Sequence, residues 1–294
     1  MVRLTIITPT YNRADLLVHL YGSLESQTNK QFCWMIVDDG STDDTFDIVS
    51  RLKGNSSFDI IYLQKTNGGK HTALNFGIKE INTELTFIVD SDDTLTEDAV
   101  QSILDVHERY KTQDRISSYT FLRGTNNKTP VIPIERNEFI ENYIVYRIKN
   151  NRPGDMAEVY KTKYLKQFPF PEFAGEKFIS EDVVWIEISK VSDAVYLNKV
   201  IYICEYLPDG LTANDKPMKF ASPLGSMTRG KQLMYRRCGI KENIKGAIIY
   251  NVYAREAKKK SIEQKILLTG REKALVCLTG CIAPYFYKKW YKGI

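Results

Sequence analysis

The sequence contains few cysteines. There are five, an odd number, at positions 33, 204, 238, 277 and 281. They form no Cys-x-x-Cys pair, and no histidine stands at the spacing of a zinc ligand. This argues against a disulfide-bonded scaffold and against a structural zinc site, and it favours a reducing compartment.

Long hydrophobic runs are also missing. The first residues, 1–8, enter a short apolar segment before Pro9, without the longer apolar region and cleavage site of a signal peptide. The apolar stretch 274–287 is shorter than the roughly 20 residues that span a bilayer, and Pro284 interrupts it. We therefore expect a cytoplasmic protein without a membrane span.

A strong charge of one sign is absent too. The 41 Lys and Arg residues nearly balance the 36 Asp and Glu residues, which leaves a net charge of +5 over 294 residues. This excess is too small to indicate a nucleic-acid partner. The basic residues concentrate in three C-terminal stretches, 229–237, 241–245 and 255–260.

The first half of the chain alternates short apolar segments with amphipathic ones. The predicted strands are 4–8, 32–37, 59–63 and 85–89. The predicted helices are 14–26, one capped by Ser41 or Thr42, and 70–80. This alternation predicts an α/β fold with a mainly parallel sheet and helices on both faces.

The regular alternation of strand-like and helix-like segments becomes weaker after about residue 116. The expected elements are strands at 117–122 and 156–160, helices at 137–147 and 181–190, and a closing pair of strands at 194–197 and 200–206. Beyond residue 210 the chain reads as basic and helical. We divide it into 1–110, 111–215 and a C-terminal helical extension, 216–294.

Polar clusters follow four of the predicted elements. They are Thr8–Arg13, Asp38–Ser41, Asn67–His71 and Asp90–Asp93. Each alone could be an ordinary turn or helix cap. Because ligands of open parallel sheets bind beyond the carboxyl ends of the strands, four clusters at one edge predict a shared ligand site.

The segment Asp90-Ser-Asp-Asp93 places three carboxylates within four residues. They would repel one another unless a cation lies among them. Oxygen ligands favour Mg²⁺ or Mn²⁺, and such an ion favours a phosphorylated ligand. The alternative is the start of the following helix, where Thr94 or Thr96 would be the cap.

Five motifs together resemble the family 2 glycosyltransferases with the GT-A fold. They are Pro9-Thr-Tyr-Asn-Arg13, Val37-Asp-Asp-Gly-Ser-Thr-Asp43, Asn67-Gly-Gly-Lys70, Ala73-Leu-Asn-Phe-Gly77 and Val89-Asp-Ser-Asp-Asp93. The resemblance is dense over the first 110 residues and thinner to about residue 215. It implies a metal-dependent, inverting transfer of a sugar from a nucleotide-diphosphate sugar, usually UDP-linked.

The resemblance also assigns roles at the nucleotide. Pro9, Tyr11 and Arg13 would border it, Asp39 would accept a hydrogen bond from the uracil, and Asp38 is the second residue of that pair. Asp90 would lie near the ribose.

The same resemblance assigns the metal and the diphosphate. Asp92 and Asp93 would lie at the metal ion and the diphosphate. The resemblance leaves open which of the carboxylates ligates the ion directly. Lys70 and His71, after the glycines that follow Asn67, stand where backbone N–H groups and a cation suit a diphosphate. The alternative there is a flexible turn with a solvated lysine.

An inverting transferase needs a general base for the acceptor hydroxyl. In the family that the sequence resembles, this base lies in an acidic pair downstream of the metal motif. The segment that matches is Ser180-Glu-Asp182, which would make Asp182 the base and Glu181 its neighbour. The alternative is an ordinary acidic start of a helix. Trp185 would stack on the acceptor or belong to the core. The segment Leu211-Thr-Ala213 weakly matches a loop over the donor phosphates, where the polar contact would rest on Thr212 or Asn214.

The C-terminal run 274–287, followed by lysines and Trp290, resembles an interfacial anchor at the inner face of a membrane. Packing on the domain or on a second subunit is the alternative. By resemblance the acceptor would be a glycan or a lipid-linked saccharide, including a polyprenyl-linked one, in capsule or surface polysaccharide synthesis. The sequence leaves the oligomeric state open, a homo-oligomer included.

The main rival reading is a haloacid-dehalogenase-like phosphatase or phosphotransferase, in which Asp90 would be the nucleophile beside Mg²⁺. Its Asp-x-Asp-x-Thr motif belongs near the chain start. Here the motif follows three strand–helix units, which argues against this reading.

Overall fold

The structure is a computed structural model that describes residues 2–127, 129–152, 154–204 and 215–291. The chain forms two compact units. The first comprises 1–142, 153–169 and 188–206, and the second comprises 143–152, 170–187 and 207–294. Two segments that we placed in the middle of the chain, 143–152 and 170–187, thus group with the C-terminal helices.

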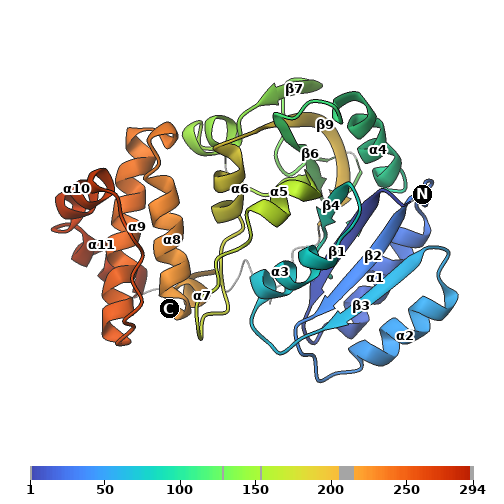
Figure 1. Ribbon diagram of the computed structural model, residues 1–294, viewed down its shortest axis with the longest axis horizontal. Coiled ribbons are helices and arrows are strands. Elements are labelled where there is room, and N and C mark those ends of the chain that lie inside the picture. Colours follow the sequence, from blue (N-terminus) through green and yellow to red (C-terminus); the bar gives the residue numbers. More distant parts are fainter. Residues whose placement is uncertain (1, 128, 153, 205–214, 292–294) are drawn as a thin grey trace. The chain divides into compact units, whose positions relative to one another are not determined.

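The first unit is built on a mixed sheet (Figure 1). Its strands β3 (Asp59–Gln64), β2 (Phe32–Asp38), β1 (Leu4–Thr10) and β4 (Leu85–Ile88) lie side by side in this order, all parallel. The sheet continues through β8 (Ala157–Lys161), β6 (Ile116–Gly124) and β9 (Asp193–Ile203). The two short strands β5 (Thr94–Leu95) and β7 (Glu138–Glu141) pair antiparallel with β9. The predicted α/β class with a mixed sheet is confirmed.

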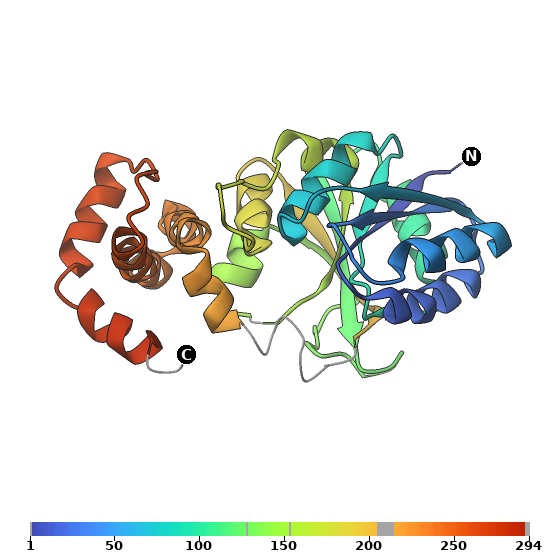
Figure 2. The ribbon, with the colours of Figure 1, turned by 90° about the horizontal axis from the view of Figure 1, so that it is seen from below.

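Helices cover both faces of the parallel strands, as Figure 2 shows. Helices α1 (Ala14–Glu25) and α2 (Thr45–Asn55) pack against each other, and α1 shares a core with Ile6 and Trp34. Helix α3 (Lys70–Glu80) covers the other face, where a Cβ on Gly77 would lie 2.7 Å from side-chain atoms of Ile7 and Val37. Neighbouring strand residues thus point to opposite helices, as the alternation of a strand requires. Helices α4 (Ala99–Tyr110) and α5 (Thr162–Gln167) complete this unit.

Pro9 does not end the first strand, although we expected it to. Strand β1 continues to Thr10, and Pro9 is paired in register with Val37. The missing N–H of Pro9 points toward β4, whose pairing with β1 ends at Ile88. Since the proline interrupts no ladder hydrogen bond there, it is tolerated inside a buried strand.

Three other expectations are wrong. The expected strands 194–197 and 200–206 are one strand, β9, up to Ile203, and residues 205 and 206 lie outside the described part of the chain. A register shift opposite 120–122 absorbs the extra residues at Asn198 and Lys199. In the region 137–147, residues 138–141 form strand β7, which pairs with β9, and a π-helix, Ile144–Lys149, follows. Helix α2 starts at Thr45 rather than near Ser41.

The second unit is helical. It contains most of α6 (Asp182–Ser189), then α7 (Asp215–Ala221), α8 (Pro223–Leu233), α9 (Ile240–Lys259), α10 (Gly270–Thr279), α11 (Ala283–Tyr291) and a 3₁₀ turn, Arg236–Cys238. Helices α8 and α9 meet at two glycines, where a Cβ on Gly246 would lie 2.5 Å from the carbonyl oxygen of Gly230. In the part of the chain that is described, no helix is both long and apolar enough to cross a membrane.

Candidate functional site

The loops after β1 and β2 bind each other. The N–H of Asn12 donates to Ser41 Oγ at 2.9 Å, and the N–H of Thr42 donates back to Asn12 Oδ1 at 2.8 Å. Asn12 has a φ of 51°, a left-handed conformation that asparagine tolerates better than most residues. Beside it, Pro9 is buried and Tyr11 is 47% exposed.

Asp38, the last residue of β2, is fully buried and binds the loop that follows this strand. Its carboxylate accepts the N–H of Ser41 at 2.8 Å and the hydroxyl of Tyr62 at 2.5 Å. Both carboxylate oxygens are therefore engaged by the protein. This separates Asp38 from Asp39 more clearly than the sequence could.

Asp39 binds the glycine loop that precedes α3. Its Oδ1 accepts the N–H of Gly68 at 3.0 Å and pairs with Lys65 Nζ at 2.8 Å, while Oδ2 accepts the N–H of Gly69 at 2.6 Å. Since a carboxylate oxygen accepts two hydrogen bonds, Oδ2 retains acceptor capacity beyond this contact. Asn67 belongs to the same loop, and its N–H would lie 3.0 Å from a Cβ on Gly40.

Each carboxylate of the acidic segment has a cationic neighbour. Lys70 Nζ lies 2.5 Å from Asp90 Oδ1, and Arg13 Nη1 lies 3.0 Å from Asp92 Oδ2. Arg123 Nη1 lies 3.9 Å from Asp93 Oδ2. The positive charge that we expected among these carboxylates is therefore supplied at least in part by side chains of the protein.

Arg123 and Tyr202 are site residues that our sequence reasoning missed. The Tyr202 hydroxyl donates to Asp93 Oδ2 at 2.6 Å and accepts the N–H of Asp90 at 3.1 Å. The guanidinium of Arg123 lies 4.1 Å from the centre of the Tyr202 ring. A charged residue inside the apolar strand β6 was the available signal, since buried charges need partners.

The pKa values follow from this packing. Burial raises the pKa of Asp93 to about 6, reinforced by the charges of Asp90 and Asp92 and opposed by the Tyr202 hydrogen bond. Burial also opposes ionisation of Asp90, but the charges of Lys70, Arg123 and Arg13 outweigh it and hold the pKa of Asp90 below its ordinary value.

The donor chemistry of this segment fits a hard divalent ion. Its ligands would be carboxylate oxygens, and the side chains of Asp90 and Asp92 are 25% and 17% exposed. Asp93 is only 6% exposed. Among the described residues, no three His, Cys, Asp or Glu side chains are grouped as a complete metal site. A bound ion would therefore take its remaining ligands from water and from a phosphorylated ligand.

Lys70 and His71 differ in placement. Both open α3, after Gly69, whose φ is 94°. Lys70 reaches Asp90, whereas the side chain of His71 lies in the interior, with the residue 2% exposed. Of these two side chains, that of Lys70 contacts the acidic segment.

Asp182 and Glu181 belong to the second unit, whereas the other predicted site residues belong to the first. Asp182 opens α6 and accepts a hydrogen bond from Ser180 Oγ at 2.6 Å and from Arg229 Nε at 2.8 Å. Trp185 is 5% exposed and packs edge-on against Phe170, so it is a core residue. The loop 211–213 and Asn214 lie outside the described residues.

Residues 5–166 match the model of the family described as "Glycosyl transferase family 2". The chain belongs to this family. Membership favours the transferase reading over the phosphatase alternative. The chain is 30% identical to an uncharacterized glycosyltransferase of Rickettsia felis over 64% of its own length, and 24% identical to Glycosyltransferase GlyG of Streptococcus pneumoniae over 68%. It spans only 30% of the Rickettsia protein but 69% of GlyG.

Two solved structures share the fold of this family 2 member. One is Staphylococcus aureus TarS 1–349 in complex with UDP, with a TM-score of 0.61 at 18% identity, over 99% of this chain and 89% of that one. The other is the mannosyltransferase PcManGT of Pyrobaculum calidifontis in complex with GDP-Man and Mn²⁺. It has a TM-score of 0.53 at 17% identity, over 98% of this chain and 82% of that one.

Proposed function

We propose that this protein transfers one sugar from a UDP-sugar to a saccharide acceptor with inversion at the anomeric carbon. One observation carries the proposal. The acidic segment Asp90–Asp93 is bound by Lys70 and Arg13, which begin or precede helices at the carboxyl edge of the parallel strands. This edge is where α/β sheets bind nucleotides.

The donor would lie along this edge. Tyr11 is exposed beside the loop of Asn12, and Asp39 keeps acceptor capacity for the imide of a uracil. Asp90 would face the ribose. Lys70 would exchange part of its contact with Asp90 for the diphosphate, where its charge offsets the charge that grows on the departing UDP.

A divalent cation, Mn²⁺ or Mg²⁺, when bound, would add positive charge at the diphosphate. Asp92 would hold it, with Asp93 beside it. Tyr202 and Arg123 keep the carboxylate of Asp93 in place for this role, because both contact its Oδ2.

Asp182 is the proposed general base, with Glu181 as its neighbour. It would take the proton from the acceptor hydroxyl while that oxygen forms a bond to the anomeric carbon and the bond to UDP breaks. Attack from the face opposite UDP gives inversion. The contacts from Ser180 and Arg229 fix the orientation of this carboxylate before the acceptor arrives.

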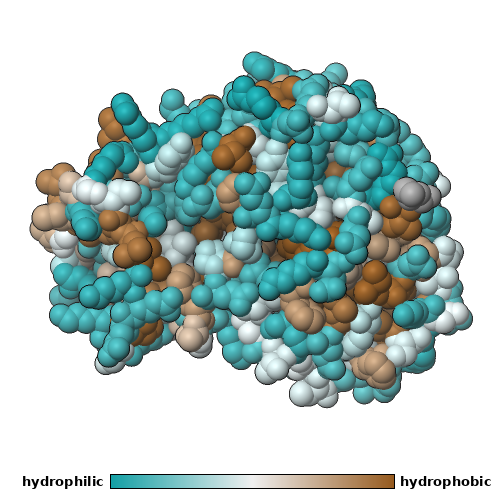
Figure 3. Space-filling model, in the orientation of Figure 1, coloured by the Kyte–Doolittle hydropathy of each residue, from teal (hydrophilic) through white to brown (hydrophobic). Residues whose placement is uncertain are grey.

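We also propose that the protein works at a membrane surface, where a lipid-linked saccharide acceptor would be presented. Leu278 on α10 and Tyr285 on α11 are 76% and 65% exposed, and lysines 288 and 289 follow. In Figure 3 hydrophobic side chains are interspersed with hydrophilic ones over these helices. Such a surface suits an anionic lipid interface.

Calorimetry with UDP tests the proposal, with GDP as the control nucleotide, first in Mn²⁺ and then in EDTA. We expect UDP to bind in Mn²⁺, and to bind much more weakly in EDTA or to the Asp92→Asn variant. The exposed Glu97→Gln substitution removes a nearby carboxylate outside the acidic segment and is the matched control. Absence of UDP binding under every condition would remove the donor and with it the proposal.

A further inference from the structure

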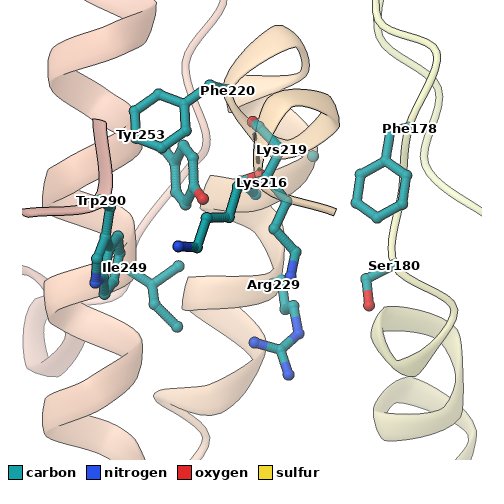
Figure 4. Close-up of a pocket in the computed structure, with 11 residues that line it drawn as sticks. Phe178, Ser180, Lys216, Lys219, Phe220, Arg229, Ile249, Tyr253 and Trp290 are labelled. Atoms are coloured by element: carbon teal, nitrogen blue, oxygen red, sulfur yellow. Dashed lines mark hydrogen bonds between the residues drawn. The ribbon is translucent and has the colours of Figure 1, made fainter. Parts of the chain in front are cut away.

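The second unit contains a cavity of about 180 Å³ that none of the roles above uses. One wall is aromatic and aliphatic, made by Phe220, Tyr253, Trp290 and Ile249 from α7, α9 and α11. Phe178 and Ser180 face it from the segment before α6, as Figure 4 shows. The lining surface is therefore mostly apolar.

Three cations reach the same cavity. Lys216 and Lys219 come from α7 and Arg229 comes from α8. Figure 4 shows these side chains between the aromatic group and Phe178. The described lining residues include no carboxylate and no side-chain amide.

The chemistry of the lining selects its ligand. Sugars are usually bound by carboxylates and side-chain amides, and the described lining has neither; its side-chain acceptors are the hydroxyl oxygens of Ser180, Ser226 and Tyr253. Lysine ammonium and arginine guanidinium groups bind phosphate, and the aromatic wall removes an apolar group from water. The cavity is thus complementary to a ligand that joins an apolar group to a phosphate.

The cavity borders the proposed base. Ser180 and Arg229 line it, and both also hydrogen-bond to the carboxylate of Asp182. A phosphate ester bound here therefore lies next to the residue that activates the acceptor.

We propose that this cavity binds the apolar phosphate portion of the acceptor. The identification of this ligand as the acceptor rests on the proposed function, but its binding to the cavity does not depend on catalysis. Phe220, Tyr253 and Trp290 contact the apolar group, while Lys216 and Lys219 bind the phosphate. Because Arg229 is shared with Asp182, occupancy of the cavity is coupled to the position of the base.

The test is calorimetric binding of octyl phosphate to the whole protein, below its critical micelle concentration. Octyl glucoside, ethyl phosphate and inorganic phosphate are the comparison ligands. We expect octyl phosphate to bind at least about tenfold more tightly than each of the three, since only it offers both the charge and the apolar group. Equal binding of octyl glucoside, or of inorganic phosphate, would overturn the proposal.

Variants locate the binding. The double variant Lys216→Ala/Lys219→Ala should weaken octyl phosphate binding about tenfold or more. The control Lys241→Ala/Lys258→Ala removes the same charge from exposed positions on α9 and should leave binding unchanged. Equal affinities of the two double variants would overturn the proposal.

UDP binding to the same proteins separates the two proposals. The lysine variants should bind UDP like the wild type, since the donor residues belong to the first unit. If UDP fails to bind while octyl phosphate binds through Lys216 and Lys219, the proposed function fails and the cavity assignment stands. If only UDP binds, the cavity assignment fails alone.

Discussion

Arg229 on α8 donates from Nε to both carboxylate oxygens of Asp182, at 3.1 Å to Oδ1 and 2.8 Å to Oδ2. A second carboxylate ties the same segment to the same helix, because buried Glu176 accepts the N–H groups of Leu224 at 2.7 Å and Gly225 at 2.8 Å. Residues 176–182 are therefore held on α8 at two points. Asp182 is oriented by α8 as well as by its own helix.

This pairing makes Arg229 a positioning residue for the proposed base. Arg229→Ala should lower kcat about 100-fold while donor binding stays unchanged, because a displaced base loses its alignment with the acceptor hydroxyl. Arg229→Lys should recover part of the loss, since it restores the charge but not the planar guanidinium. Asp182→Asn should bind UDP and transfer no sugar. UDP-release kinetics would measure kcat, and calorimetry would measure donor binding. A kcat within twofold of wild type in Arg229→Ala would contradict the assignment.

Tyr202 should matter for donor binding without touching the donor. Tyr202→Phe removes the hydroxyl that binds Asp93 Oδ2 and the N–H of Asp90, so both lose a buried partner. We expect UDP affinity in Mn²⁺ to fall about fivefold, the effect of one hydrogen bond of roughly 1 kcal/mol. Tyr285→Phe, at an exposed position, is the control. A lower melting temperature with unchanged UDP affinity would limit Tyr202 to a structural role.

Most of the first 110 residues could be predicted from the sequence because the signals there are local. The apolar runs of β1 to β4 are bounded by turn residues, and the predicted helix 70–80 coincides with α3. The acidic segment was also visible. Of its cation partners, Arg13 and Lys70 were predicted at the same site, but Arg123 was not, since it lies 30 residues or more from each carboxylate and no local pattern reports such a contact.

The region after residue 116 was predicted less well because tertiary pairing decides it. Asn198 and Lys199 resemble a turn, yet β9 passes through them with a bulge against β6. Pairing with β9 makes a strand of residues 138–141, within a segment that has helical spacing, and Phe139 stacks on Tyr196 there. The cavity near Arg229 combines residues from distant segments, and no spacing in the sequence could predict it.

The glycines between α8 and α9 should be required for packing. Gly230→Ala places a methyl group 2.7 Å from the carbonyl oxygen of Gly246 and should cost about 1–3 kcal/mol of stability. Gly22→Ala on α1 meets no atom within 4 Å and should stabilise the protein by up to about 1 kcal/mol. Urea unfolding of the two variants checks the contrast. If both alanines stabilise the protein, the close approach of the helices is wrong.

Glu25 should contribute stability that disappears in acid. Burial opposes its ionisation, but hydrogen bonds from Ser57 and Tyr21 and the charge of Lys30 lower its pKa from 4.5 to about 2. Because the pKa is depressed in the folded state, the stabilisation is complete above pH 4.5 and is lost as the pH falls toward 2. Glu25→Gln should therefore be about 1–2 kcal/mol less stable at pH 7, a value reduced for the partial exposure of the side chain.

Unfolding in urea at several pH values measures this difference. The gap between wild type and Glu25→Gln should close between pH 4.5 and 2. Glu97→Gln, at an exposed position, should show no such dependence. A gap that is constant across this range would mean that the substitution acts through packing and not through charge.

Membrane association should depend on exposed residues of α10 and α11 and not on the partly buried aromatic residues of α11. Trp290 packs against Tyr253, and Tyr287 against Phe220, so deleting residues 265–294 would disturb the second unit itself. Leu278→Asp with Tyr285→Asp changes only the exposed face. This variant should lose flotation with anionic phosphatidylglycerol vesicles, because two new charges oppose insertion and lipid attraction. Ile240→Asp, 80% exposed at the start of α9, should float like wild type. If the double variant also floats like wild type, these helices serve only to pack the second unit, and the acceptor would have to reach the enzyme without a membrane contact at α10 and α11.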